Sequence, residues 1–205
     1  MSLHIWNNEC CKYEEKGIDF KNYIKNSRDE EYAEIMCKTI SGNDDYVFAL
    51  DGALSMETYR NQKTRILFIL KEAYDSTPRN NNGVYVWDEL KWAQFNIEKI
   101  SNPTWRRIFQ WSNLILNKCG QEQLCDQIKK ELIQKIAVIN IKKVNGEKNS
   151  KDNELKNIVT KKPENIISQI EYFKPTIIIC GHTGWLLDIA LNSELRKVKN
   201  ADWIY

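Results

Sequence analysis

The chain has 205 residues, of which 28% are charged, and its formal net charge of +2 is close to neutral. This length suits one α/β domain with a substantial core, and so small a net charge excludes a strong overall positive field as the basis for binding nucleic acid. No apolar run approaches the roughly 20 residues that cross a bilayer, and neither a signal-peptide pattern nor a zinc or disulfide spacing of the six cysteines is visible. We therefore expect a cytoplasmic protein that does not enter membranes, with reduced, mostly buried thiols and no cofactor.

The first 46 residues are expected to form a helical segment packed on the domain that follows. Apolar residues three or four positions apart over residues 18–40 predict amphipathic helices. A short apolar run at residues 47–50 leads into Asp51-Gly52, which indicates a turn, and residues 55–61 are expected to form a polar connection.

Three apolar runs predict buried parallel strands, because strands covered on both faces are continuously apolar. They lie at residues 65–70, 136–141 and 176–181. Helical patterns and one lysine-rich loop separate or follow them. Helices are expected within 84–100 and at 103–118, 121–134, 163–173 and 185–198, and the loop is expected at 142–162. Residues 201–205 resemble the start of a fourth strand. This alternation predicts a three-layer α/β/α sandwich with a central four-stranded parallel sheet over residues 47–205.

Polar residues accompany each of the three apolar runs. The first run continues into Lys71, Glu72, Tyr74 and Asp75, the second contains Asn140 and continues into Lys142 and Lys143, and the third is followed by His182. Ligands of open parallel sheets bind beyond the carboxyl ends of the strands. The sequence therefore predicts that these side chains share one ligand site.

Two of these stretches resemble motifs of the uracil-DNA glycosylase superfamily. KEAYD at 71–75 is similar to the Gly-Glu-Ala-Pro-Gly motif of that superfamily, so Glu72 falls at the acidic position that orients or activates the attacking water. INIKK at 139–143 is similar to the strand whose asparagine reads the edge of the flipped base, and Asn140 falls at that position. The resemblance extends, in order and spacing, over residues 47–205.

The resemblance implies hydrolysis of the N-glycosidic bond of uracil or another damaged base, with DNA as the partner of a protein we expect to be monomeric. This reaction builds positive charge on the sugar and negative charge on the departing base, so a carboxylate beside the sugar favours it. Glu72 is the catalytic candidate. The substrate-binding candidates are Lys71, Tyr74, Asp75, Asn140 and His182, and the candidates for phosphate contacts are Lys142 and Lys143.

The chain departs from the superfamily at several positions. Lys71 replaces the glycine of the first motif, and Ala73 or Tyr74 stands where proline is expected. Lys143 stands where one branch has a cysteine of its iron–sulfur cluster, and the terminal His-Pro-Ser type motif is not seen before Tyr205.

Structural roles compete with each functional assignment. Glu72 could cap a helix or pair with a lysine, Asn140 could bond to backbone groups, and His182 suits a strand-to-helix turn. Lys142 and Lys143 are equally consistent with a solvated edge. Four tryptophans have spacings that suit helical packing: Trp87, Trp92, Trp105 and Trp111.

Two further functions stay open at this stage. One is a catalytically silent module of the same fold that binds a nucleobase, a nucleotide or DNA. The other is a different doubly wound protein, flavodoxin-like for example, that binds phosphate after the first strand. The absence of a glycine-rich loop at that point counts against the second of these.

Overall fold

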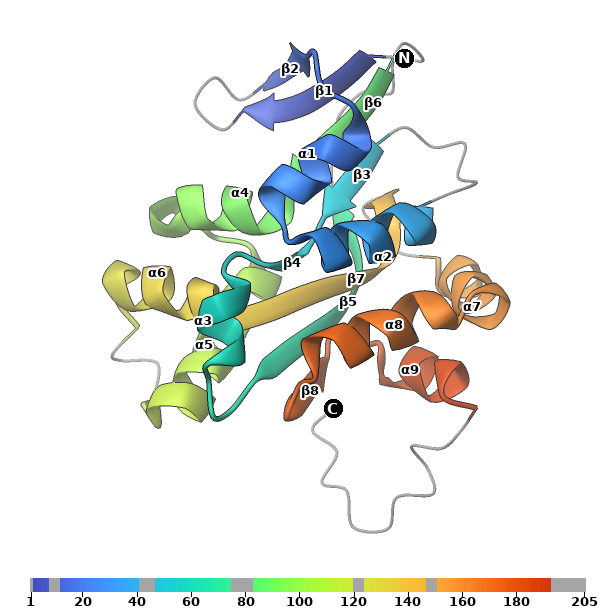
Figure 1. Ribbon diagram of the computed structural model, residues 1–205. Coiled ribbons are helices and arrows are strands. Elements are labelled where there is room, and N and C mark those ends of the chain that lie inside the picture. Colours follow the sequence, from blue (N-terminus) through green and yellow to red (C-terminus); the bar gives the residue numbers. More distant parts are fainter. Residues whose placement is uncertain are drawn as a thin grey trace.

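A computed structural model describes residues 2–7, 12–40, 47–74, 83–119, 124–146 and 151–192 (Figure 1). The strands are β1 (Ser2–Asn7), β2 (Lys12–Lys16), β3 (Val47–Leu50), β4 (Gly52–Ala53), β5 (Ile66–Tyr74), β6 (Gly83–Asp88), β7 (Ile136–Gly146) and β8 (Ile177–Cys180). The helices are α1 (Phe20–Ser27), α2 (Glu30–Ile40), α3 (Met56–Arg60), α4 (Glu89–Phe95), η1 (Ile97–Lys99), α5 (Pro103–Asn117), α6 (Asp126–Lys135), α7 (Asp152–Lys161), α8 (Glu164–Phe173) and α9 (Gly184–Ala190).

The strands form a mixed sheet in the order β2-β1-β6-β3-β7-β5-β8, and β4 pairs beside β7. The three predicted strands are β5, β7 and β8, and they are parallel neighbours. β1, β6 and β3 are parallel to one another, but β3 meets β7 antiparallel where Phe48 pairs with Val144. The prediction of a purely parallel sheet is therefore wrong. It fails because β3 and β4, which the sequence shows only as a short apolar run and a turn, both pair antiparallel with β7. The strand β6 is also absent from the prediction, because it runs into α4 without a turn signal and its residues read as part of a helix.

Other differences from the sequence prediction have local causes. The segment over residues 1–46 contains the expected helices, but it also begins with the hairpin of β1 and β2, which extends the sheet through β6. The expected polar connection contains α3, capped by the Ser55 hydroxyl, which accepts from the Thr58 amide at 3.1 Å. The expected lysine-rich loop begins instead with the rest of β7 and ends with α7. Residues 201–205 lie outside the described residues.

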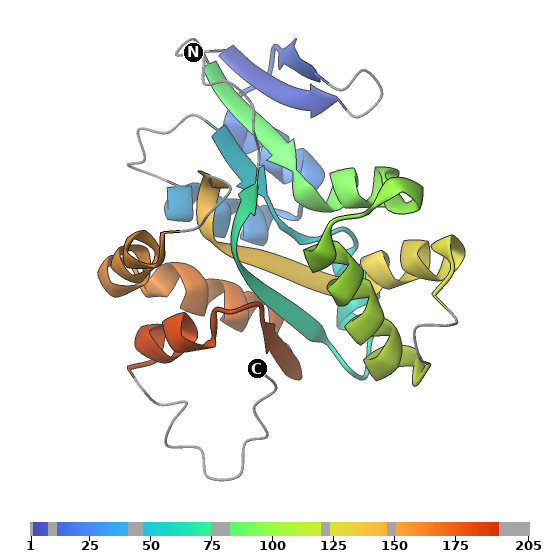
Figure 2. The ribbon, with the colours of Figure 1, turned by 180° about the vertical axis from the view of Figure 1, so that it is seen from behind.

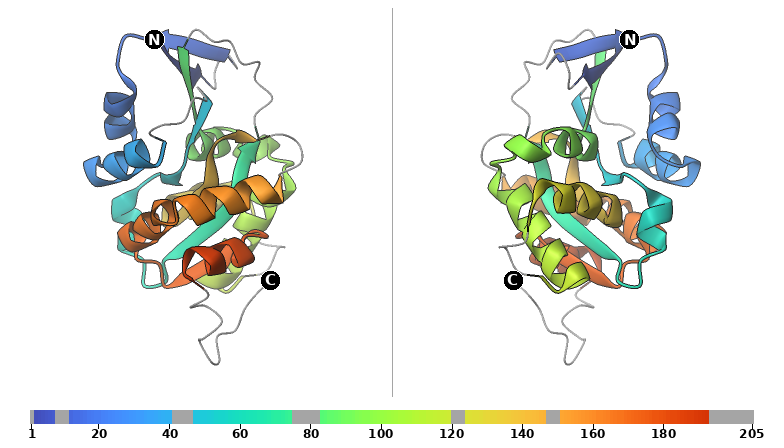
Figure 3. Two further views of the ribbon diagram at one scale, coloured as in Figure 1. Left: turned by 90° about the vertical axis from the view of Figure 1, so that its right-hand side faces the viewer. Right: turned by 90° about the vertical axis from the view of Figure 1, so that its left-hand side faces the viewer.

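The alternation of side chains along β5 sends two layers of helices to opposite faces of the sheet. Leu67 and Ile69 pack into a core with α1, α2, α3, α7, α8 and α9, whereas Ile66 and Phe68 pack into a core with α4, η1, α5 and α6. Figure 1 shows the first layer in front of the sheet, Figure 2 shows the second, and the side views in Figure 3 show strands between helices.

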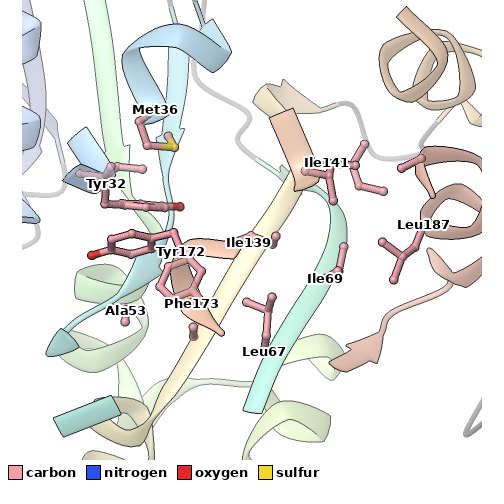
Figure 4. Packing of buried hydrophobic residues seen from close by; sticks show 14 of the residues in the cluster. Tyr32, Met36, Ala53, Leu67, Ile69, Ile139, Ile141, Tyr172, Phe173 and Leu187 are labelled. Carbon is pink, nitrogen blue, oxygen red and sulfur yellow. The ribbon is translucent and has the colours of Figure 1, made fainter. Parts of the chain in front are cut away.

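Aromatic side chains fasten α2 and α8 over the first face (Figure 4). The rings of Tyr32 and Tyr172 are stacked with centroids 5.2 Å apart, and Phe173 contacts both. Fully burying one such side chain contributes about 1.5 to 3 kcal/mol, so this cluster holds the two helices firmly on the strands.

Gly52 leaves no room for a side chain between β4 and α2. Its φ of +110° suits glycine, and an added Cβ would lie 2.7 Å from Cε1 of Tyr32. We expect Gly52→Ala to lower the free energy of unfolding by about 2 kcal/mol or more, because alanine is strained at this φ and would displace a buried ring. Urea unfolding measures the loss.

Gly17→Ala is the matched control, because an added Cβ there meets no atom of the described residues within 4 Å. We expect it to change the free energy of unfolding by less than about 0.5 kcal/mol. Equal losses in the two variants would contradict the close packing of Gly52 on Tyr32.

Candidate functional site

Asp51, which is 0% exposed, is the centre of a buried polar network. The Tyr32 hydroxyl donates to its Oδ1 at 2.7 Å, and Nζ of Lys143 donates to its Oδ2 at 2.5 Å. Oδ2 also accepts from the backbone amide of Asn140 at 2.7 Å. Asp51 lies between β3 and β4, where the antiparallel ladder with β7 is interrupted. Its carboxylate therefore accepts the hydrogen bond from an amide of β7 that a backbone carbonyl of the neighbouring strand would otherwise accept.

A buried arginine ties this network to the start of α4. The Arg28 guanidinium donates to both carboxylate oxygens of Asp88, at 3.0 and 2.9 Å, and its Nε donates to the backbone oxygen of Asp51 at 3.0 Å. Asp88 also caps α4 by accepting from the Lys91 amide. The fork geometry satisfies both charges, as burial of an ion pair requires.

Asn140 presents an incompletely satisfied amide on the other side of β7. Its side-chain nitrogen donates to Oε2 of Glu89 at 2.6 Å, whereas its buried Oδ1 has no hydrogen-bond partner among the described residues. Asn140 is 1% exposed and Glu89 is 4% exposed. Burial raises the pKa of Glu89 to about 7, although the hydrogen bond from Asn140 opposes this shift. Burial also lowers the pKa of Lys143, against the attraction of Asp51.

Glu72 lies on the same face of the sheet as Asn140. It is two residues closer to the C-terminal ends of the strands than the level of Asn140. Leu70 pairs with Asn140, and Glu72 pairs with Lys142. Nζ of Lys142 lies 3.3 Å from Oε2 of Glu72 and 2.8 Å from Oε1 of Glu154. Burial acts to lower the pKa of Lys142, but the bonds to these two carboxylates outweigh it and raise the pKa. The structure thus brings the catalytic candidate and the base-reading candidate together.

The other candidates from the first strand are placed differently. Lys71 points to the opposite face, where its Nζ lies 2.8 Å from Oδ1 of Asp152. The backbone of Tyr74 pairs with Gly146, but its side chain is outside the described part of the structure. Asp75 also lies outside the described residues.

Lys142 and Lys143 do not form a solvated edge, because both are buried in ion pairs. Their ammonium groups face the carboxylates of Glu72 and Asp51 rather than solvent. In this arrangement neither lysine is available to a phosphate. Because β7 continues to Gly146, both lysines belong to the strand and their side chains lie in the interior.

The turn after β8 lies close to the end of β5. The amide of Gly181 donates to the Ile69 oxygen at 2.9 Å, and the buried Thr183 hydroxyl donates to the same oxygen at 2.6 Å. An added Cβ at Gly181 would lie 2.9 Å from Cδ2 of Leu70. His182 is exposed and has a φ of 58° in this turn. These contacts give the turn a structural role, and the ligand contact of His182 stays a prediction.

The tryptophans near α4 and α5 differ in their burial. Trp87 and Trp92 meet edge to face with ring centroids 5.7 Å apart, and Trp105 is buried in the second core. Phe95 in the last turn of α4 is 58% exposed.

A cavity of about 270 Å³ lies beside Arg28 and Tyr32 of the Asp51 network. It is bordered by the junction of α1 with α2, by α3 and by the end of α8. It is lined by Asn26, Ser27, Arg28, Asp29, Tyr32, Ala53, Leu54, Met56, Tyr172 and Phe173. None of Glu72, Asn140 and His182 lines it. This cavity is therefore separate from the predicted site.

The sequence analysis gave Arg28 and Glu89 no role in the site, and it gave Asp51 only as part of a turn. A usable signal was the alternation in β7, because Lys143 falls on the same face as Ile139 and Ile141. A lysine in that register requires a buried acid. The alternation alone does not identify Asp51 as that acid.

Comparisons with known proteins do not identify a relative: no protein family, no curated protein and no solved structure shows a significant match. Within the described ranges, no group of three or more His, Cys, Asp or Glu side chains is arranged to hold a metal ion. No helix in the described part of the chain has the length and apolarity needed to span a membrane.

We expect Asp51→Asn to lower the free energy of unfolding by about 3 to 5 kcal/mol, because it leaves the buried Lys143 ammonium without its counter-charge. Adding Lys143→Met removes that charge, so the double variant should be more stable than Asp51→Asn alone. Urea unfolding of both single variants and the double variant measures the coupling. Strictly additive losses would contradict the ion pair.

The pKa of Glu89 predicts a pH dependence of stability. The unfolded carboxyl titrates near its ordinary value of 4.5 and the folded one at about 7, so the folded protein holds the extra proton between these values. The stabilisation is complete below pH 4.5 and is lost as pH rises through 7, by up to about 3 kcal/mol. Urea unfolding between pH 4.5 and 8 tests this, and Glu89→Gln should flatten the slope. The same slope in both proteins would assign it to other groups.

Proposed function

We propose that this chain is a nucleobase-binding α/β domain of the uracil-DNA glycosylase type, which hydrolyses the N-glycosidic bond of a base taken out of the DNA stack. The observation that carries the proposal is the placement of Glu72 and Asn140 on one face of neighbouring parallel strands. The motifs that resemble the superfamily are the ones that contribute these two residues.

The strand order supports a site at this place. In the order β7-β5-β8 the first of the three parallel strands lies in the middle. The chain therefore forms β7 on one side of β5 and then crosses over to form β8 on its other side. Such a reversal creates a crevice at the carboxyl ends of the strands, where doubly wound sheets bind ligands. Glu72 stands near the end of β5, and the turn with His182 follows β8.

Glu72 has the chemistry that the reaction requires. A carboxylate beside the sugar stabilises the positive charge that develops there, and it can also orient the attacking water. The ammonium of Lys142, 3.3 Å away, fixes the position of this carboxylate. We therefore assign Lys142 to positioning Glu72, and we do not assign it to phosphate binding.

Asn140 supplies the base-reading group. Within the described part of the chain its buried Oδ1 has no partner, and leaving a polar atom in that state costs about 1 to 3 kcal/mol. A ligand N–H that reached this oxygen would recover that energy. Binding of a flipped base therefore accounts for an amide that the protein itself leaves half satisfied.

A catalytically silent binding module is the second candidate. Glu72 and Asn140 already have partners in Lys142 and Glu89. If a base binds without a water at the Glu72 carboxylate, no nucleophile reaches the sugar. The protein would then recognise the base and leave the bond intact.

Incubation with a uracil-containing oligonucleotide, followed by alkali to cut abasic sites, tests the proposal. We expect strand cleavage by the wild type and a loss of at least about 100-fold in rate for Glu72→Gln, which is the range for a residue in general acid–base catalysis. Glu171→Gln is the matched control because Glu171 is exposed on α8. It should keep the wild-type rate.

Base binding without cleavage by the wild type would favour the silent module. Cleavage that survives Glu72→Gln would remove Glu72 from the catalytic role. Circular dichroism of both variants shows that a lost rate does not come from a lost fold.

A further inference from the structure

The cavity beside Arg28 and Tyr32 has an apolar side and a polar side. The apolar lining comes from aliphatic, thioether and aromatic side chains: Tyr32, Ala53, Leu54, Met56, Tyr172 and Phe173. Figure 4 shows the three aromatic members together over the sheet. The polar lining is the run of four residues 26–29, where α1 ends and α2 begins. Apolar walls with a few polar groups on one side are the usual form of a small-molecule site, and a volume of about 270 Å³ suits a small ligand.

Arg28 is the cation of this lining, and its guanidinium is already bound. Its two terminal nitrogens donate to the carboxylate of Asp88, and Nη1 also donates to the backbone oxygen of Ser27 at 2.8 Å. Nε donates to the backbone oxygen of Asp51. The side chain is 4% exposed. An anionic ligand would therefore have to compete with a buried ion pair for this residue.

Asp29 is the anion of the lining, and it is exposed to solvent. Its Oδ1 accepts from the Tyr32 amide at 3.0 Å, and its Oδ2 accepts from the Tyr172 hydroxyl. Both donors are neutral, and no salt bridge to Asp29 is formed within the described residues. The Arg60 guanidinium lies 5.2 Å from the centroid of the Tyr172 ring, but Arg60 does not line the cavity. A carboxylate offers about four acceptor positions, so Asp29 can accept further hydrogen bonds beside the two tyrosines.

The two helix ends at this junction also favour a positive charge. Asn26 and Ser27 are the last residues of α1, and the carbonyl groups at the end of a helix carry partial negative charge. The beginning of α2 has the opposite polarity, but Asp29 caps it, and Glu30 and Glu31 follow in its first turn. The chain's own carboxylates therefore satisfy the positive end of α2, and the polar side of the cavity is left with a preference for cations.

We propose that this cavity is a second ligand site, which binds a small organic cation that carries a primary ammonium group on an apolar body. The ammonium, with three N–H donors, binds the Asp29 carboxylate and the acceptors at the end of α1. The apolar body packs against the side formed by Ala53, Met56 and Phe173. The site is independent of the proposed base site, because neither Glu72 nor Asn140 lines it.

Three ligands with the same apolar body and different head groups test the choice of charge. They are phenethylamine, which is an ammonium ion at neutral pH, 2-phenylethanol and 3-phenylpropionate. Titration of the full chain followed by two-dimensional ¹H–¹⁵N NMR gives the affinities and locates the perturbed amides. We expect phenethylamine to bind roughly 10-fold or more tightly than the alcohol, the usual value of a hydrogen bond to a charged group, and to shift amides of residues 26–32 and 53–56. The carboxylate should bind more weakly than the alcohol.

Asp29→Asn removes the charge and keeps the helix cap, because asparagine caps helices about as well as aspartate. It should weaken the binding of phenethylamine by roughly 10-fold and leave that of the alcohol within about threefold. Glu31→Gln is the matched control, since it removes a charge from the same turn of α2 without touching the lining. It should keep the affinity for phenethylamine within about threefold of the wild type. Met56→Trp places a larger side chain in the cavity and should abolish the binding of both ligands.

Several outcomes overturn the inference. Tighter binding of 3-phenylpropionate than of phenethylamine would assign the cavity to anions, and equal affinities for the three ligands would remove the role of charge. Phenethylamine binding that survives Asp29→Asn or Met56→Trp would place the ligand elsewhere, and no binding of any of the three leaves the cavity without this function. Circular dichroism shows that each variant is folded. None of these results bears on the cleavage of uracil DNA, so the two proposals fail separately.

Discussion

The buried carboxylate of Asp51 is the constraint on which the rest of the structure depends. It joins α2 through Tyr32, the backbone of β7 through Asn140 and a lysine side chain through Lys143, all inside the protein. A charge at 0% exposure is tolerated only when such partners surround it. Asp51 separates β3 from β4. At this residue the half of the sheet with β1, β6 and β3 meets the half with β7, β5 and β8, which runs in the opposite direction.

The same network determines the geometry of the candidate site. Asp51 fixes the backbone of Asn140, and the pair of Arg28 and Asp88 fixes the start of α4 and hence Glu89. The Asn140 amide and the Glu89 carboxylate to which it donates are therefore held by separate buried ion pairs. Such support is what a recognition site needs, because a reading group that could rotate would accept the wrong ligand as readily as the right one.

The register of β5 with β7 determines both which apolar side chains enter the second core and which polar side chains lie at the candidate site. Up to the pair of Phe68 and Val138 the residues on this face are apolar and belong to the second core. The next pair joins Leu70 to Asn140, and the one after it joins Glu72 to Lys142. The apolar part positions the polar part, since a slip of one residue would turn every side chain to the other face. The ion pair of Glu72 with Lys142 is the consequence of that fixed register.

The sequence by itself determined most of the helices (α3 and α7 are the exceptions), the three apolar parallel strands and the face of the sheet that Glu72 and Asn140 share. These features follow from hydrophobic periodicity and from the alternation of side chains, which are local properties of the chain. The mixed direction of the sheet, the burial of Lys142 and Lys143 and the partnership of Asn140 with Glu89 were decided only by the tertiary structure. Each depends on which distant segments meet: Asp51 with Lys143, and Glu89 with Asn140. Periodicity shows which face a residue occupies, but it does not show which opposite charge or amide comes to lie beside it.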